Sequence, residues 1–370
     1  MAVLSDAQRE AGWTIAKLGD IATLVMGTSP KSSDVVDYPL GIPLLNGPAE
    51  FTDKYPVPVK WTEKGIRFSE PGDILFCVRA TLGKMNFSDR QYAIGRGLAA
   101  IRGIDELHTR YIYYTLLSTM ESILRNANGT IYLSVTKSDV ENFEIPLPPK
   151  DTLKRIAGIL GSLDDKIEAN TRLIQTLDSL GEAATRKYLK SVQKTQKLND
   201  IAHIVMGQSP KGETLNTEGS GVLFFQGKKD FGFRYPTPRT YTTAATRMAE
   251  PLDILFSVRA PIGALNRSVE ACCVGRGLAA IRSSCGQENT LFYTLKTNPN
   301  LWEKFEGEGT IFSAINKKGL SELDIPFSET AISNGVEDFL TSVEQEIFSL
   351  EQENLQLAET RDALIKRLID

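Results

Sequence analysis

Apolar residues recur at alternating spacings of four and three along two stretches of the chain, residues 151–194 and 330–370. This is a heptad pattern, which predicts a long helix in each stretch with one apolar seam suited to a coiled coil. The two seams follow one register, in which Ile156 of the first corresponds to Val336 of the second. The predicted seam residues are Ile156, Leu160, Leu163, Ile167, Ile174, Leu177, Val336, Leu340, Val343, Ile347, Leu350, Leu357 and Leu364.

The simplest partner for each seam is the other seam. A pseudo-two-fold axis between the copies requires antiparallel helices, and about 40 residues at ~1.5 Å each give a rod of roughly 60 Å. Polar residues interrupt the seam at Asn170, Asn354 and Arg361, and such residues fix register at a cost in stability. Gly181 and Ala184 are small and are expected to leave room for bulky residues of the partner helix. The alternative is that each helix packs only on its own globular part.

The remaining pattern is mixed helix and strand. Residues Ile15–Met26 suggest a short helix ending at Gly27, a plausible C-cap. The run "PGDILFCVRA" (71–80) predicts a turn followed by a buried strand. Thr109–Asn126 is apolar at helical spacing and is expected to stop at Gly129.

The chain is an internal duplication in which the offset between the copies never changes. "LGDIATLVMGTSPK" (18–31) returns as "LNDIAHIVMGQSPK" (198–211), and "ILFCVRATLGKMNFS" (74–88) returns as "ILFSVRAPIGALNRS" (254–268). Two large repeats indicate two equivalent domains rather than a solenoid of short units. We therefore expect an N-terminal arm (1–16), a first α/β domain (17–150), a long helix (151–194), a second α/β domain (195–329) and another long helix (330–370).

The stretch "GRGLAAIR" occurs at Gly95–Arg102 and again at Gly275–Arg282. It fits the loose dinucleotide-binding pattern G-x-G-x-x-A, which must leave a strand and open a helix. Here Gln91–Ile94 fits a strand, but the next glycine, Gly103, follows the motif too closely for a crossover helix. The sequence instead favours a tight sheet turn between two strands.

Composition is that of an ordinary globular protein, with 41% hydrophobic and 24% charged residues. The net charge of −4 argues at first against a nucleic-acid partner. However, residues 330–370 hold three Lys/Arg and nine Asp/Glu, a net −6, which leaves +2 on residues 1–329. The part of the chain before the last long helix can therefore still present a local basic face.

Other features narrow the class of protein. The chain has no apolar run of membrane-spanning length and no visible signal peptide, and its four cysteines show no C-x-x-C spacing. These features predict a cytoplasmic protein with reduced thiols and no membrane partner. Only two histidines are present, so a histidine-rich metal site is not expected.

Motifs for chemistry are also missing. The sequence has no G-x-x-x-x-G-K-[ST] loop for ATP hydrolysis and no Asn-Pro-Pro or Asp-Pro-Pro box of an amino-methyltransferase. We expect no catalysis by this chain itself and no cofactor or metal bound to it. Two alternatives stay open: a two-headed scaffold that binds only protein, and a DNA-acting enzyme.

The order of motifs resembles one family. Trp13 and Leu18–Ile21 are followed by G-x-S-P, "DILFxVRA", "GRGLAAIR", a Gly-Thr segment, an Ile-Pro turn and a long helix, and the series from the Leu-x-Asp-Ile motif onward repeats. This arrangement is similar to the specificity subunit of a type I restriction–modification system, over essentially the whole chain. The resemblance implies an α+β fold in which two pseudo-two-fold-related α/β target-recognition domains are separated by two long antiparallel coiled-coil helices.

The resemblance also implies a function and partners. Each domain would read one half of a bipartite target in double-stranded DNA, and the helices would set the spacer. Two modification (methyltransferase) subunits would dock near the helices, and restriction/translocase subunits would join the full complex. Those partners would use S-adenosylmethionine, and ATP and Mg²⁺ for restriction.

The best candidates for DNA contact lie where the two copies diverge, at 46–67 and 226–247, because a shared scaffold repeats while surfaces for different half-sites do not. The G-x-S-P-K loops at 27–31 and 207–211 are a second candidate region, for which a plain structural turn is the alternative. Basic, hydroxyl and amide side chains suit phosphates and base edges. The candidates are Ser29, Lys31, Asn46, Lys54, Lys60, Arg67, Gln208, Ser209, Lys211, Gln226, Lys228, Lys229, Arg234, Arg239 and Arg247. A solvated loop is the alternative for each. We expect the repeated Arg79, Arg96, Arg259 and Arg276 to pair with carboxylates instead.

Overall fold

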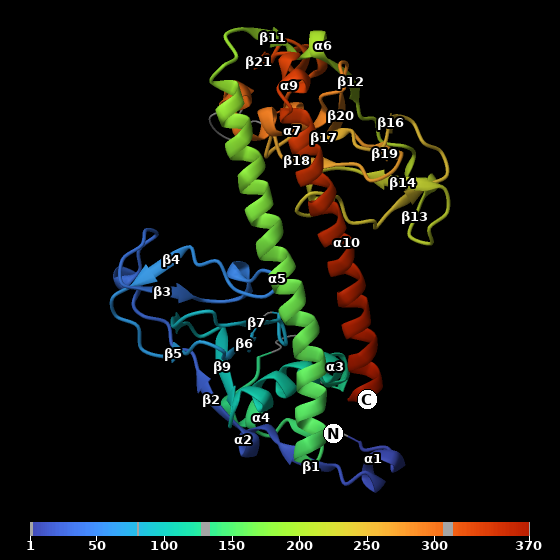
Figure 1. The fold of residues 1–370 in the computed structure, drawn as a ribbon. Helices are drawn as coiled ribbons and strands as arrows, with labels where there is room; N and C mark the ends of the chain where they lie inside the picture. The colour runs from blue at the N-terminus through green and yellow to red at the C-terminus, as the bar shows by residue number, and fades with distance from the viewer. Residues whose placement is uncertain (1–2, 80, 127–133, 306–313, 370) are drawn as a thin grey trace. The chain divides into compact units, whose positions relative to one another are not determined.

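The structure is a computed structural model that describes residues 3–79, 81–126, 134–305 and 314–369 (Figure 1). By internal contacts the chain divides into two units. Unit 1 comprises residues 1–168 and 355–370, and unit 2 comprises residues 169–354. Each unit therefore contains one globular head together with a part of both long helices.

Head 1 is built around two four-stranded sheets. The first has the strand order β2-β9-β6-β7, and the second has the order β4-β3-β8-β5. All neighbouring strands are antiparallel except β3 and β8, which are parallel. The strands are β2 (Ala22–Met26), β3 (Ile42–Leu45), β4 (Lys60–Thr62), β5 (Phe68–Ser69), β6 (Ile74–Cys77), β7 (Met85–Phe87), β8 (Tyr92–Ile94) and β9 (Leu98–Gly103).

Helices and a two-stranded ribbon complete head 1. Strand β1 (Thr14–Lys17) pairs antiparallel with β10 (Glu144–Leu147). The expected helix over Thr109–Asn126 is confirmed as part of α3 (Glu106–Asn126), whereas its expected stop at Gly129 lies outside the described residues. The short helices are α1 (Asp6–Glu10), α2 (Leu18–Ile21), α4 (Lys137–Glu141), η1 (Ser32–Asp34) and η2 (Pro48–Glu50).

The helix expected over Ile15–Met26 is wrong. This segment forms strand β1, a single helical turn in α2 and then strand β2. Strand β2 pairs with β9 along its whole length, from Ala22 opposite Gly103 to Met26 opposite Ala99. Pairing with strands distant in sequence therefore overrides the helix-like spacing of the apolar residues.

Strand β9 explains the small and apolar letters of the repeated motif. Ala99 and Ile101 face one buried cluster, and Leu98 and Ala100 face another. Successive side chains of a strand point to opposite faces, so β9 is buried on both sides. Small residues are needed there because packed layers lie on both of its faces.

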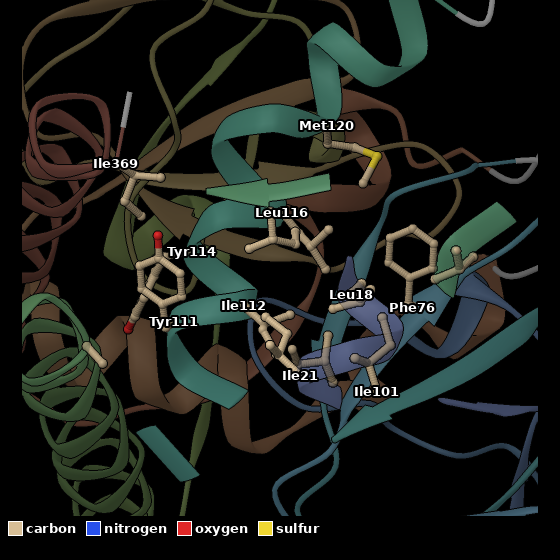
Figure 2. Close-up of a cluster of buried hydrophobic side chains, with 14 of the residues drawn as sticks. Leu18, Ile21, Phe76, Ile101, Tyr111, Ile112, Tyr114, Leu116, Met120 and Ile369 are labelled. Atoms are coloured by element: carbon tan, nitrogen blue, oxygen red, sulfur yellow. The ribbon is translucent and has the colours of Figure 1, made fainter. Parts of the chain in front are cut away.

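The core of unit 1 draws on segments that are far apart in sequence. Leu18 and Ile21 of α2 and Phe76 and Ile101 of the sheet pack with the apolar face of α3, as Figure 2 shows. Ile369 belongs to the same cluster. The C-terminal end of the chain, with Ile365 and Ile369, thus supplies part of the core of unit 1.

Head 2 repeats this plan with the offset expected from the sequence. Strand register repeats as well: Ile74 lies opposite Ile101 in head 1, and Ile254 lies opposite Ile281 in head 2. The ribbon β11-β21 corresponds to β1-β10, and the sheets have the orders β12-β20-β17-β18 and β13-β15-β14-β19-β16. The strands are β11 (Thr195–Lys197), β12 (Ala202–Met206), β13 (Leu215–Asn216), β14 (Val222–Phe225), β15 (Tyr241–Thr242), β16 (Met248–Ala249), β17 (Ile254–Ser257), β18 (Leu265–Arg267), β19 (Cys272–Val274), β20 (Leu278–Ser283) and β21 (Asp324–Pro326).

The helices of head 2 are short. They comprise α6 (Leu198–Ile201), η3 (Gly212–Thr214), η4 (Lys228–Asp230), α7 (Glu288–Thr297), η5 (Pro299–Phe305), α8 (Lys317–Ser321) and α9 (Thr330–Ser333). Helix α9 ends before Gly335, which has a positive φ of 70°. The second long helix begins directly after this glycine.

The two long helices are α5 (Lys150–Leu189) and α10 (Val336–Leu368), and inside unit 2 they pack antiparallel. Asn170 contacts Asn354 near one end of this pairing, and Tyr188 contacts Ser328, just before α9, near the other. Between them, Ile174 packs in a buried cluster with Val343, Ile347 and Leu350. The expected fold class, an α+β fold with two sheet-containing heads and two long helices, is confirmed.

Two of the polar residues in the seam meet each other. The side-chain Nδ2 of Asn170 donates to Asn354 Oδ1 at 3.0 Å and to Glu353 Oε2 at 2.7 Å. Asn170 is buried, so a shift in register would leave its amide without these partners. Arg361, the third polar residue, pairs with Asp164 at 2.8 Å inside unit 1.

None of the predicted seam residues is exposed, yet they do not form one continuous helix–helix seam. Ile156 and Leu160 belong to the core of unit 1, and Leu340 belongs to the core of unit 2. Gly181 also differs from the expectation: a Cβ there would lie 2.5 Å from the ring of Tyr293, which is on α7 and not on the partner long helix. The seam therefore serves both helix pairing and head packing.

Within the described ranges, no helix combines the length and the apolar character needed to cross a membrane.

Candidate nucleic-acid interface

Several segments of head 1 meet at the turn after strand β8. The N–H of Ile94 donates to the carbonyl of Arg67 at 2.9 Å, and the carbonyl of Ile94 accepts from the N–H of Thr28 at 2.8 Å. The N–H of Gly95 donates to the carbonyl of Leu45 at 2.7 Å. The loop after β2, the end of β3 and the residue before β5 therefore converge on the first Gly-Arg-Gly turn.

This convergence requires glycine. A Cβ on Gly97 would lie 2.3 Å from the backbone oxygen of Asn46, and a Cβ on Gly27 would lie 2.1 Å from the backbone oxygen of Gly95. No side chain fits at such distances without moving the backbone. The glycines of the motif thus allow loops to approach closely, which supports the tight-turn interpretation over a cofactor loop.

The turn of head 2 is built in the same way. A Cβ on Gly207 would lie 2.1 Å from the oxygen of Gly275, and a Cβ on Gly277 would lie 2.5 Å from the oxygen of Gln226. Asn46 and Gln226 occupy equivalent positions in the two copies, directly beside the turn. The two heads therefore hold different amide side chains, Asn46 and Gln226, at the same position of the same backbone arrangement.

The serines of the G-x-S-P loops support these turns. Ser29 Oγ accepts from the N–H of Arg96 at 3.2 Å, and Ser209 Oγ accepts from the N–H of Arg276 at 3.3 Å. Ser209 also donates to Gln226 Oε1 at 2.9 Å. Both serines, proposed from the sequence as DNA contacts, thus hold the arginine of the turn in place.

Arginines surround the turn in both heads, and they are exposed. Arg96 sits within the turn, Arg67 is hydrogen-bonded through its backbone to Ile94, and Arg79 follows Val78, whose N–H donates to Gly97 at 3.0 Å. Equivalent bonds join the same segments of head 2. The set, called here the repeated arginines, is Arg67, Arg79, Arg96, Arg247, Arg259 and Arg276.

None of the repeated arginines forms an ion pair with any residue that the structure describes. The expected carboxylate pairing of Arg79, Arg96, Arg259 and Arg276 is therefore wrong for this part of the chain. Neighbouring arginines with structural roles behave differently: Arg102 is bound by Asp73 through two hydrogen bonds of 2.6 and 2.9 Å. Arg282 and Asp253 in head 2, the equivalents of Arg102 and Asp73, form the same pair. The repeated arginines are thus left with their charge facing solvent.

Other basic candidates are also exposed. Lys228 and Lys229 lie on η4, which directly follows Gly227. Lys211 lies 4.0 Å from Glu213, an exposed carboxylate, and solvent weakens such a pair. The remaining exposed candidates are Lys31, Lys60, Gln208 and Arg239, whereas Asn46 and Gln226 are half-buried.

Two of the candidates for DNA contact, Arg234 and Lys54, are instead paired with carboxylates of the protein. Arg234 is only 1% exposed, and its guanidinium is 2.5 Å from Asp178 Oδ1 and 3.2 Å from Glu344 Oε1, so the prediction that it contacts DNA is wrong. Lys54 lies 2.5 Å from Glu168 Oε2 and is half-buried, so its charge is already paired.

Several charged residues are buried around Arg234. Arg267 is also buried, 3.5 Å from Glu344 Oε2, and burial lowers its pKa. Burial also raises the pKa of Glu351 to about 7, although the Arg234 backbone N–H donates to its Oε1 at 3.2 Å. The buried arginines and carboxylates of this interior thus compensate one another's charge.

Sequence reasoning missed the repeated arginines at positions 79, 96, 259 and 276 as exposed charges. For Arg96 and Arg276 one signal was available: each lies between two glycines, which have no side chain to cover the arginine. It also missed Asp178, Glu344 and Glu351, because the heptad pattern gives no sign that they face a head.

Comparisons with known proteins identify similar sequences and folds. Residues 10–179 match the model of the type I restriction modification DNA specificity domain. The putative type I restriction enzyme MjaX specificity subunit of Methanocaldococcus jannaschii is 30% identical over 64% of this chain, which spans 60% of that relative. The HindI specificity subunit of Haemophilus influenzae is 27% identical over 35% of this chain and 31% of its own length.

A solved structure extends the likeness to the whole fold. The crystal structure of a type I restriction-modification S subunit from M. genitalium has a TM-score of 0.61 and 19% identity, over 97% of this chain and 96% of that one. At this identity the likeness shows the fold. The resemblance to specificity subunits of type I restriction–modification systems, inferred from the repeated motifs, is thereby confirmed.

Proposed function

We propose that this chain is the DNA-recognition subunit of a type I restriction–modification complex, with each head reading one half of a bipartite target in double-stranded DNA. The observation that carries the proposal is the set of repeated arginines, exposed around one turn in both heads and without carboxylate partners among the described residues. Exposed, unpaired arginines suit DNA, because phosphate contacts provide most of the affinity.

The two kinds of residue in the interface suggest two roles. The repeated arginines are the same in both heads, so they suit phosphates, which are the same in every half-site. Asn46 and Gln226 differ at one position, and Lys228 and Lys229 replace Pro48 and Ala49. Amides and lysines can read adenine and guanine edges, so these differing residues are assigned to the bases.

The long helices are assigned to spacing and assembly. Each long helix contributes to both units, which suits a spacer between half-sites. The heads are assigned to residues 17–150 and 195–329, and an N-terminal arm to residues 1–16. Two modification subunits would dock on them, and restriction/translocase subunits would complete the complex. Those partners would bring S-adenosylmethionine, ATP and Mg²⁺, while this chain would perform no chemistry and would work with them in the cytoplasm.

Methylation of DNA by the chain with its modification subunit tests the proposal. The expected result is one asymmetric bipartite methylated sequence, with duplex binding that weakens steeply as salt rises. The purified chain alone should show no methylation, cleavage or ATP hydrolysis. Binding of the modification subunit without salt-dependent binding of DNA would instead support a two-headed protein scaffold.

A double variant tests the assigned face. Arg96→Ala with Arg276→Ala should lower affinity for all sequences while keeping the methylated sequence the same, because phosphates carry no base identity. The control is Lys17→Ala, an exposed lysine on the β1-β10 ribbon, which should leave affinity unchanged. Equal loss in both variants would indicate a general effect of charge and not a defined face.

A further inference from the structure

Two equivalent pairs of residues connect the divergent segments of the heads to the long helices. These segments, residues 46–67 in head 1 and 226–247 in head 2, are called here the recognition segments. In head 1, Lys54 Nζ lies 2.5 Å from Glu168 Oε2, and the Tyr55 hydroxyl donates to the same oxygen at 3.0 Å. Glu168 is on α5. The segment of head 1 that contains Lys54 and Tyr55 is therefore held on α5 by one carboxylate.

In head 2 the equivalent residues, Arg234 and Tyr235, contact both long helices. The Arg234 guanidinium pairs with Asp178 on α5 at 2.5 Å and with Glu344 on α10 at 3.2 Å. The Arg234 backbone N–H donates to Glu351 at 3.2 Å. The ring of Tyr235 packs edge-on against Phe348 of α10, with centroids 5.2 Å apart.

Neighbouring groups hold this contact in one arrangement. The Tyr293 hydroxyl donates to Glu344 Oε1 at 2.8 Å, and Lys296 pairs with Asp178 and, at 3.2 Å, with Glu182. Buried ion pairs seldom add much stability over apolar residues, because desolvation offsets their attraction. Such a network is better suited to defining one geometry than to raising stability.

We propose that Lys54–Tyr55 and Arg234–Tyr235 are positioning residues that fix each recognition segment on the long helices and so determine which spacing between half-sites is accepted. The inference rests on the proposed function. These side chains would act through the helices and not by contacting DNA, since Lys54 and Arg234 already have carboxylate partners. Their loss should widen the range of spacer lengths and leave the bases of the half-sites unchanged.

Head 1 offers the safer test because its contact is partly exposed, so the variants should still fold. The complex of the chain with its modification subunit is used, and the half-sites and preferred spacer are first read from methylation by the wild-type complex. Duplexes then carry these half-sites with spacers one base pair shorter, equal and one longer. The variants are Glu168→Gln combined with Tyr55→Phe, and Lys54→Met.

The expected result is that methylation at the two wrong spacers, relative to the preferred one, rises about fivefold, the scale of one partly exposed ion pair. Lys54→Arg, which keeps a charge for Glu168, should restore the wild-type ratio. Lys60→Met is the control: this lysine is exposed on β4, and its loss should lower affinity without changing the ratio.

Other results would overturn the inference. An unchanged spacer ratio in folded variants would make the contact merely structural. An altered base in the first half-site would make Lys54 a DNA contact. If the wild-type complex methylates no bipartite sequence at all, the proposed function itself fails, and the inference fails with it.

Discussion

Replacing Glu351 by glutamine should stabilise unit 2 at neutral and alkaline pH. The carboxyl group of Glu351 is removed from water beside Glu344, and burial raises its pKa from 4.5 to about 7. In the unfolded chain the same group ionises near its ordinary pKa. The folded protein must therefore either hold a proton there or bury a charge.

The sign and size of the effect follow from linkage. A carboxyl whose folded pKa is raised reduces the free energy of unfolding as pH rises from about 4.5 to about 7, because the unfolded state ionises first. A shift of about 2.5 units at ~1.36 kcal/mol per unit gives about 3 kcal/mol at pH 8. Glutamine avoids this penalty because it has no proton to lose, and its oxygen can still accept from the Arg234 N–H.

Thermal unfolding of the full chain at pH 5 and pH 8 provides the assay. Glu351→Gln should raise the melting temperature of unit 2 by several degrees at pH 8 and by much less at pH 5. The matched control is Glu346→Gln, an exposed residue of the same helix, which should change little at either pH. A variant that is less stable than wild type at pH 8 would refute the reasoning, since Glu351 would then be an ionised partner of Arg234.

Three further predictions address the interface and the core. In the complex, Arg96→Ala and Arg276→Ala should each reduce the slope of log affinity against log salt by about 0.9, measured by titration at several salt concentrations. Gly97→Ala should destabilise head 1 by about 1–3 kcal/mol, because its Cβ would meet a backbone oxygen at 2.3 Å, whereas Gly47→Ala has no atom within 4 Å and should be neutral in denaturant unfolding. Ile365→Ala should cost about 2–5 kcal/mol and loosen head 1, detectable as faster proteolysis of head 1 than of head 2.

Much of the fold could be predicted from the sequence because the information is local or repeated. The constant offset between the copies defined two equivalent domains, and the heptad spacing identified side chains that the structure leaves unexposed. The same spacing could not separate Leu160, which packs under head 1, from Ile174, which packs against the other helix. Both are apolar, and only the tertiary neighbour differs.

The candidate site was predicted less well, and for a physical reason. Arg234 stood in a basic segment and looked like a DNA contact, but its partners Asp178 and Glu344 lie far from it in sequence, on the two long helices. Whether a charge is free depends on such distant partners, which spacing along the chain does not reveal. The Gly-Arg-Gly turns are the opposite case. The glycines beside Arg96 and Arg276 have no side chains that could cover the arginine, so its exposure could be predicted from the sequence.

Unit 1 is discontinuous, and this affects how the protein is made. Its core needs Ile365 and Ile369, which follow the whole of unit 2 in the chain. At about 5–20 residues per second, a ribosome needs roughly 10 to 40 s to travel from residue 168 to residue 365. During that interval head 1 emerges with an apolar surface still uncovered, and a chaperone would have time to bind it. The domain synthesised first is thus the last to be completed.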